Sequence, residues 1–114
     1  MARILVVEDE PEQLAVRRQL LEAAGYEVFT AQTASEAMAQ LGGCRVVLMD
    51  LRIPRIEDGL DLIRAAALVS ARVLVLSGGQ SDTPLEVDEF LLKPCSSRKM
   101  LESVARLCAD AQGA

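Results

Sequence analysis

Ile4-Leu5-Val6-Val7-Glu8-Asp9-Glu10, close to the start of the chain, joins four consecutive apolar residues to three acidic ones. Three further short apolar runs follow along the chain, at 46–49, 73–76 and, more weakly, 90–92. Unbroken runs rich in β-branched residues are typical of parallel strands that are covered on both faces. Residues 26–31 alternate instead, as an edge strand does. The sequence therefore predicts five strands.

Helical patterns lie between these runs. We expect helices from Pro11 to just before Gly25, from the capping residue Thr33 to Gly42-Gly43, over 59–69, and over 97–109. Strands that alternate with helices predict an α/β fold, a doubly wound parallel sheet with helices on both faces.

One residue interrupts the apolar stripe of the first predicted helix. Arg17 occupies a stripe position there, so we expect its aliphatic stem to lie against the sheet.

The fourth crossover, from Ser77 to Lys93, is short. Once a strand at 90–92 is subtracted, about ten residues remain, which is near the minimum for a crossover. They include Gly78-Gly79 and Pro84, which discourage a helix. We therefore expect a loop with at most a turn or two around 84–87, and a fourth helix that is shortened or missing.

Composition excludes several classes of function. The 114 residues carry a net charge of −5 and only 3% are aromatic, which argues against a nucleic-acid partner. The sequence contains no histidine, so it offers no imidazole base and no His-bound transition metal. No apolar run is long enough to cross a membrane, and the sequence predicts a cytoplasmic protein with no membrane partner.

The polar residues that follow the strands fall at one place. Parallel strands deliver their carboxyl ends to the same edge of the sheet, so residues 8–10, Asp50, Ser77 and Lys93 should meet there. Crowded carboxylates repel one another, and a hard divalent cation with oxygen ligands relieves the repulsion. Mg²⁺ fits such a set best. A carboxylate beside that ion can attack phosphorus, with Lys93 and Ser77 stabilising charge on the phosphoryl oxygens.

Four segments in this order make the chain resemble the receiver domain of two-component response regulators over nearly its whole length. They are 4–10, 47–54, 75–78 and 90–94. The resemblance implies a flavodoxin-like sheet in the order 2-1-3-4-5, with residues 1–114 as a single receiver domain. It also implies a cis peptide at Lys93-Pro94.

The resemblance further assigns roles to individual residues. Asp50 would be the phosphoacceptor, and Ser77 and Lys93 would contact the phosphoryl group. Phe90 would be the switch residue. Mg²⁺ would be held by the ligands Glu8, Asp9, Asp50 and the backbone carbonyl of Arg52.

Two features depart from the family pattern. The segment 54–59 is one residue longer than the family's usual loop, and the crossover after Ser77 is shortened. Both bear on how a phosphorylated state is displayed to partners, and neither touches the acidic cluster.

The expected function is that of a phosphoacceptor switch. A histidine kinase or a histidine phosphotransfer protein would supply the phosphoryl group, an unknown downstream protein would receive the signal, and the chain would not be an enzyme. Few residues follow the last predicted helix, so we expect no output domain.

Other interpretations stay open. Residues 8–10 could simply cap the first helix. A docking module that works without phosphorylation would predict a broken acidic cluster, whereas this one is intact. A phosphohydrolase with an aspartyl nucleophile would typically carry an acid two residues after Asp50, where this chain has Arg52.

Overall fold

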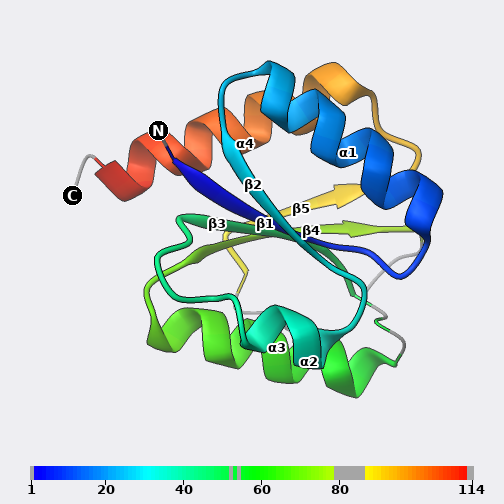
Figure 1. Cartoon of the computed structure of the whole chain (residues 1–114), viewed down its shortest axis with the longest axis vertical. Helices are drawn as coiled ribbons and strands as arrows, with labels where there is room; N and C mark the ends of the chain where they lie inside the picture. The colour runs from blue at the N-terminus through cyan, green and yellow to red at the C-terminus, as the bar shows by residue number, and fades with distance from the viewer. Residues whose placement is uncertain (1, 52, 54, 79–86, 113–114) are drawn as a thin grey trace.

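The computed structural model describes residues 2–51, 53, 55–78 and 87–112, with side chains described as far as 109. Its centre is a sheet of five parallel strands in the order β2-β1-β3-β4-β5, as predicted (Figure 1). The strands are β1 (Arg3–Val7), β2 (Glu27–Ala31), β3 (Val46–Asp50), β4 (Arg72–Ser77) and β5 (Glu89–Leu92).

The central strands are buried on both faces because helices cover each of them. Four helices are described: α1 (Pro11–Ala23), α2 (Ala34–Met38), α3 (Ile56–Leu68) and α4 (Ser97–Gln112). In Figure 1, α1 and α4 lie on one side of the sheet and α2 and α3 on the other. Residues of β1, β3 and β4 therefore point alternately into two cores, one beneath each helical layer.

The predicted limits of α1, the predicted start of α4 and the expected cis peptide bond agree with the structure. Helix α1 begins at Pro11, and Gly25 follows it with a φ of +98°, a left-handed conformation that glycine adopts without strain. Helix α4 begins at Ser97, as expected. The peptide bond between Lys93 and Pro94 is cis.

The predicted end of the second helix was wrong. Thr33 caps α2 by accepting a hydrogen bond from the backbone N–H of Glu36, but the helix ends at Met38 and not at Gly42-Gly43. The N–H of Gln40 bonds to the carbonyl of Ala37, three residues back, so the last turn tightens and the chain leaves the helical path.

The predicted start of the third helix was also wrong. Helix α3 begins at Ile56, three residues before Gly59. The carboxylate of Asp58 accepts a hydrogen bond from the backbone N–H of Arg55 at 3.3 Å, and acidic residues in a first turn favour the helix dipole. The longer segment after Asp50 is therefore partly absorbed into α3.

The expectation of a shortened or missing fourth helix concerns residues 79–86, which lie outside the described residues. Residues 78, 87 and 88, which flank them, are not helical. Among the described residues, no helix is both long enough and apolar enough to cross a membrane.

Candidate functional site

The carboxyl edge of the sheet gathers the predicted polar residues. Asp50 is the last residue of β3, Glu8 follows β1 directly, and Lys93 follows β5. The backbone N–H of Lys93 donates to the carbonyl of Ser77 at 2.7 Å, which fixes the lysine beside the end of β4. The topology therefore brings together residues that are up to 85 positions apart, since 93 − 8 = 85.

Lys93 is the centre of this arrangement. Its Nζ lies 2.6 Å from Oδ2 of Asp50 and 3.9 Å from Oε1 of Glu8. The side chain of Asp50 is 20% exposed, whereas that of Glu8 is 4% exposed. One ammonium group thus faces two carboxylates, of which Asp50 is the one that solvent reaches.

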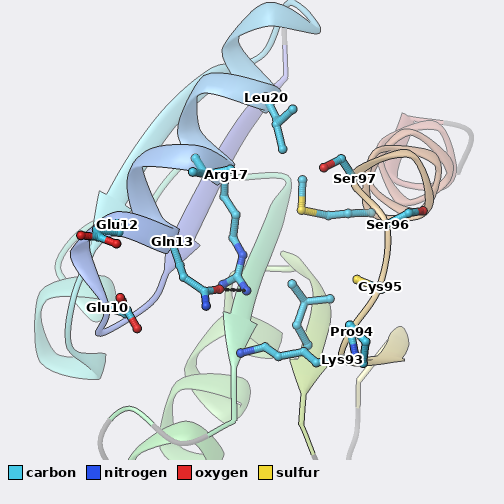
Figure 2. Close-up of a pocket in the computed structure, with 13 residues that line it drawn as sticks. Glu10, Glu12, Gln13, Arg17, Leu20, Lys93, Pro94, Cys95, Ser96 and Ser97 are labelled. Carbon is cyan, nitrogen blue, oxygen red and sulfur yellow. Dashed lines mark hydrogen bonds between the residues drawn. The ribbon is translucent and has the colours of Figure 1, made fainter.

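Arg17 is a member of the cluster that sequence reasoning missed. The sequence predicted only that its stem would lie along the sheet, but its guanidinium is also turned inward, and Nη1 donates to Oε1 of Glu8 at 2.6 Å. Nη2 donates to Oε1 of Gln13 at 3.1 Å, a bond drawn in Figure 2. A carboxylate placed directly after a buried strand needs a partner, and this was the available signal.

The three consecutive acidic residues Glu8, Asp9 and Glu10 differ in burial. Glu8 is buried, and its Oε2 accepts the backbone N–H of Glu10 at 3.2 Å, whereas Asp9 and Glu10 are exposed. The side chain of Glu10, at the N-cap position of α1, makes no capping hydrogen bond. Of the three acids, Glu8 alone is therefore drawn into the buried edge of the sheet.

Within the described residues, no three acidic or cysteine side chains stand close enough to form a metal-holding group. Glu8 is turned toward Arg17, and Asp9 is exposed. Arg52, whose carbonyl is the fourth predicted ligand, lies outside the described residues.

Ser77 and Phe90 complete the set of predicted residues. Ser77 ends β4 and is partly exposed at the same edge as Asp50, and the register aligns it with Leu92 of β5. Phe90 lies on β5, opposite Val75, and packs half-buried against the core on the α2–α3 side. Ser77 therefore stands at the edge that carries Asp50 and Lys93, whereas Phe90 lies within β5, three residues before Lys93.

A groove of about 690 Å³ opens beside the cluster. Helix α1 forms one wall and the segment 93–97 forms the other, and both Arg17 and Lys93 line it (Figure 2). Glu10 and Glu12 line the groove on the α1 side, close to the carboxyl edge of the sheet.

Comparison with known proteins gives a consistent result. The family model of the response regulator receiver domain matches residues 4–105. The transcriptional regulatory protein AruR of Pseudomonas aeruginosa is 33% identical over 123 residues, covering 92% of this chain and 48% of AruR. The C4-dicarboxylate transport transcriptional regulatory protein DctD of the same organism is 33% identical over 116 residues, covering 91% of this chain and 24% of DctD. The chain spans about half of AruR and a quarter of DctD.

Solved structures agree with this match over the whole fold. A CheY-like receiver domain protein from Methanospirillum hungatei JF-1 has a TM-score of 0.89 at 27% identity, covering 99% of this chain and 98% of that one. The chemotaxis protein CheY4 of Vibrio cholerae has a TM-score of 0.81 at 26% identity, covering 94% and 98%. By its sequence, its strand order and its carboxyl-edge cluster, this chain belongs to the family of response regulator receiver domains.

Proposed function

We propose that this chain is a phosphoacceptor switch that takes a phosphoryl group on Asp50. The observation that carries the proposal is the ion pair between Lys93 and Asp50, at 2.6 Å, at the end of the central strand β3. Of the two carboxylates that Lys93 faces, Asp50 is the more accessible, and the ammonium group can pair with a phosphoryl oxygen once Asp50 is modified.

The reaction is a phosphoryl transfer. An oxygen of Asp50 attacks phosphorus, the P–N bond of a phosphohistidine donor breaks, and its electron pair stays on the imidazole, which takes up a proton. Lys93 then pairs with a phosphoryl oxygen in place of the Asp50 carboxylate. Ser77, at the end of the neighbouring strand, donates a hydrogen bond to the same group, and Phe90 responds as the switch.

The donor set at the carboxyl edge fits Mg²⁺, because every side chain assigned to it binds through oxygen. Asp9, Asp50 and the backbone carbonyl of Arg52 would hold the ion. Glu8, the remaining predicted ligand, already accepts a hydrogen bond from Arg17 through Oε1 at 2.6 Å. When bound, the ion neutralises charge on the phosphoryl oxygens.

The donor would be a histidine kinase or a histidine phosphotransfer protein, and the groove beside α1, which Lys93 lines, would form part of its docking surface. The net charge of −5 disfavours nucleic acid as a direct partner. The remaining proposals are that residues 1–114 work as one receiver domain in the cytoplasm, without enzymatic turnover, and signal by binding a downstream protein.

The test is labelling of the full chain with acetyl phosphate, read as intact mass. The wild type should gain one phosphoryl group with Mg²⁺ and none with excess EDTA. Asp50→Asn should gain none, whereas the matched control Asp61→Asn, on the exposed face of α3, should label like the wild type. Labelling of Asp50→Asn at the wild-type level would refute the proposal, and so would a wild type that never labels.

A further inference from the structure

The burial of Arg17 is the feature of this site that the proposed function leaves unexplained. Arg17 lies one turn before Leu21 on the inward face of α1, and it is 8% exposed while Leu21 is fully buried. Its neighbour Arg18 instead points outward and pairs with Glu22. A guanidinium withdrawn from water is costly unless its charge is matched.

The match for Arg17 is Glu8. Their contact is 2.6 Å, and the two side chains are 10% and 4% exposed. Ion pairs that are this well buried are screened little by salt, and breaking one by removing a single partner is strongly unfavourable. Gln13 holds the other end of the guanidinium at 3.1 Å, which keeps it in place.

Both oxygens of Glu8 are therefore engaged. Oε1 accepts from Arg17 and lies 3.9 Å from Nζ of Lys93, and Oε2 accepts the backbone N–H of Glu10. A metal ion in direct contact with Glu8 would have to replace a charge-assisted hydrogen bond. It would also sit close to a fixed positive charge.

We propose that Arg17 is a built-in cation that competes with magnesium at this site: it reserves Glu8 and lowers the affinity of the acidic edge for Mg²⁺. The inference rests on the proposed function, because it concerns the metal that phosphorylation uses. In the metal-free protein Arg17 neutralises the most buried carboxylate, so the fold does not depend on the ion. When Mg²⁺ arrives it meets two carboxylates, Asp9 and Asp50, together with the repulsion of a nearby guanidinium.

The experiment is calorimetric titration of the full chain with Mg²⁺ in the absence of any phosphoryl donor. Arg17→Gln keeps a hydrogen-bond donor for Glu8 and removes the charge, so its Mg²⁺ affinity should rise about tenfold. Arg18→Gln is the matched control, since it removes the same charge from the next residue, and it should stay within about twofold of the wild type. Arg17→Lys keeps the charge and should also stay close to the wild type.

Equal affinity in Arg17→Gln and Arg18→Gln would overturn the proposal. So would a rise in Arg17→Lys as large as that in Arg17→Gln, because charge would then not be the cause. The wild type provides a second measurement that does not depend on the folding of Arg17→Gln. On Mg²⁺ titration followed by ¹³C NMR, the carboxyl carbon of Glu8 should shift less than those of Asp9 and Asp50, and a larger shift at Glu8 would refute the inference.

The two proposals fail in different ways. Normal magnesium-dependent labelling of Asp50 with no effect of Arg17→Gln on affinity would remove only the role of Arg17. Absence of Mg²⁺ binding in the wild type and in every variant would overturn the magnesium part of the proposed function and this inference with it.

Discussion

Replacing Gly59 by alanine should destabilise the fold and displace the backbone next to Asp50. Gly59 lies in the first turns of α3 and is buried, and a Cβ built on it would stand 2.0 Å from the backbone oxygen of Leu51 and 3.0 Å from its carbonyl carbon. Leu51 follows Asp50 directly, so the close approach of α3 fixes the backbone that carries the proposed phosphoacceptor. The obstacle is a backbone carbonyl, which cannot rotate away as a side chain can.

The magnitude follows from two opposing terms. Alanine in place of glycine inside a helix is worth about 1 kcal/mol in its favour. Overpacking a buried site costs about 1–3 kcal/mol, and the value here belongs at the upper end because both clashing groups are backbone. We expect a net loss of about 2 kcal/mol, which lowers the midpoint of thermal unfolding by about 8–10 °C in a domain of this size.

Circular dichroism melts of Gly59→Ala and of the control Gly42→Ala measure this. A Cβ at Gly42 would meet nothing within 4 Å, so the control should melt within about 2 °C of the wild type. Phosphoryl labelling of Gly59→Ala should also slow, because the segment after Asp50 must move. A Gly59→Ala protein that melts at or above the wild-type temperature and labels normally would refute this reasoning.

Three further predictions concern single side chains. Lys93→Ala should remain folded at room temperature, because its pair with Asp50 is partly exposed and such pairs add little to stability; loss of the circular dichroism signal would make the lysine structural. Thr33→Ala removes the side-chain cap of α2 and should cost about 1 kcal/mol, read as a fall of about 4 °C in the melting midpoint, and an unchanged midpoint would contradict it. Burial raises the pKa of the Glu89 carboxyl, but hydrogen bonds from Ser103 and Arg106 and the charge of Arg106 outweigh it, so the pKa is lowered overall. The stability that Glu89 contributes is therefore present above the ordinary pKa of its carboxyl group and is lost as the pH falls through the lowered pKa of the folded state. Glu89→Gln should flatten the acid side of the curve of melting midpoint against pH, and an unaltered curve would count against it.

The five strands and the two helical layers were predictable because apolar runs and helical stripes are local features of the sequence, whereas the strand order followed from the family resemblance. Continuous apolar runs such as 4–7 and 46–49 have one stable environment, the middle of a parallel sheet covered on both faces. Pro11 and Gly25 mark the ends of α1 through backbone chemistry that acts locally. Such signals do not depend on residues distant in the chain.

The boundaries that were wrong depend on weaker and competing signals. The pattern from Ala34 to Leu41 fits a longer helix, yet Gln40 donates its side-chain amide to the carbonyl of Thr30, and the chain turns before Gly42. The apolar pattern of α3 begins at Gly59, but the carboxylate of Asp58 accepts a hydrogen bond from the backbone N–H of Arg55, so the first turn forms before that residue. Side-chain bonds of this kind are not visible in hydrophobic periodicity.

The cluster of Asp50 and Lys93 was predictable because parallel topology dictates where strands end. The partner of Glu8 was not, since the apolar stripe of α1 does not indicate which group the guanidinium of Arg17 contacts. Arg17 lies on that stripe, and Glu8 lies where β1 ends. Their pairing becomes evident only once α1 is packed over the sheet. Residues that the topology brings together were accessible from sequence, whereas pairs made by helix packing were not.

Reductive trapping of the phosphorylated chain tests the central claim most directly. Sodium borohydride reduces an aspartyl phosphate to homoserine, so treatment after labelling with acetyl phosphate and Mg²⁺ marks the residue that held the phosphoryl group. Peptide mapping should find homoserine at position 50 of the wild type, at no other aspartate, and nowhere when Mg²⁺ is withheld. Homoserine at Asp9 or another aspartate, with position 50 intact, would contradict the account.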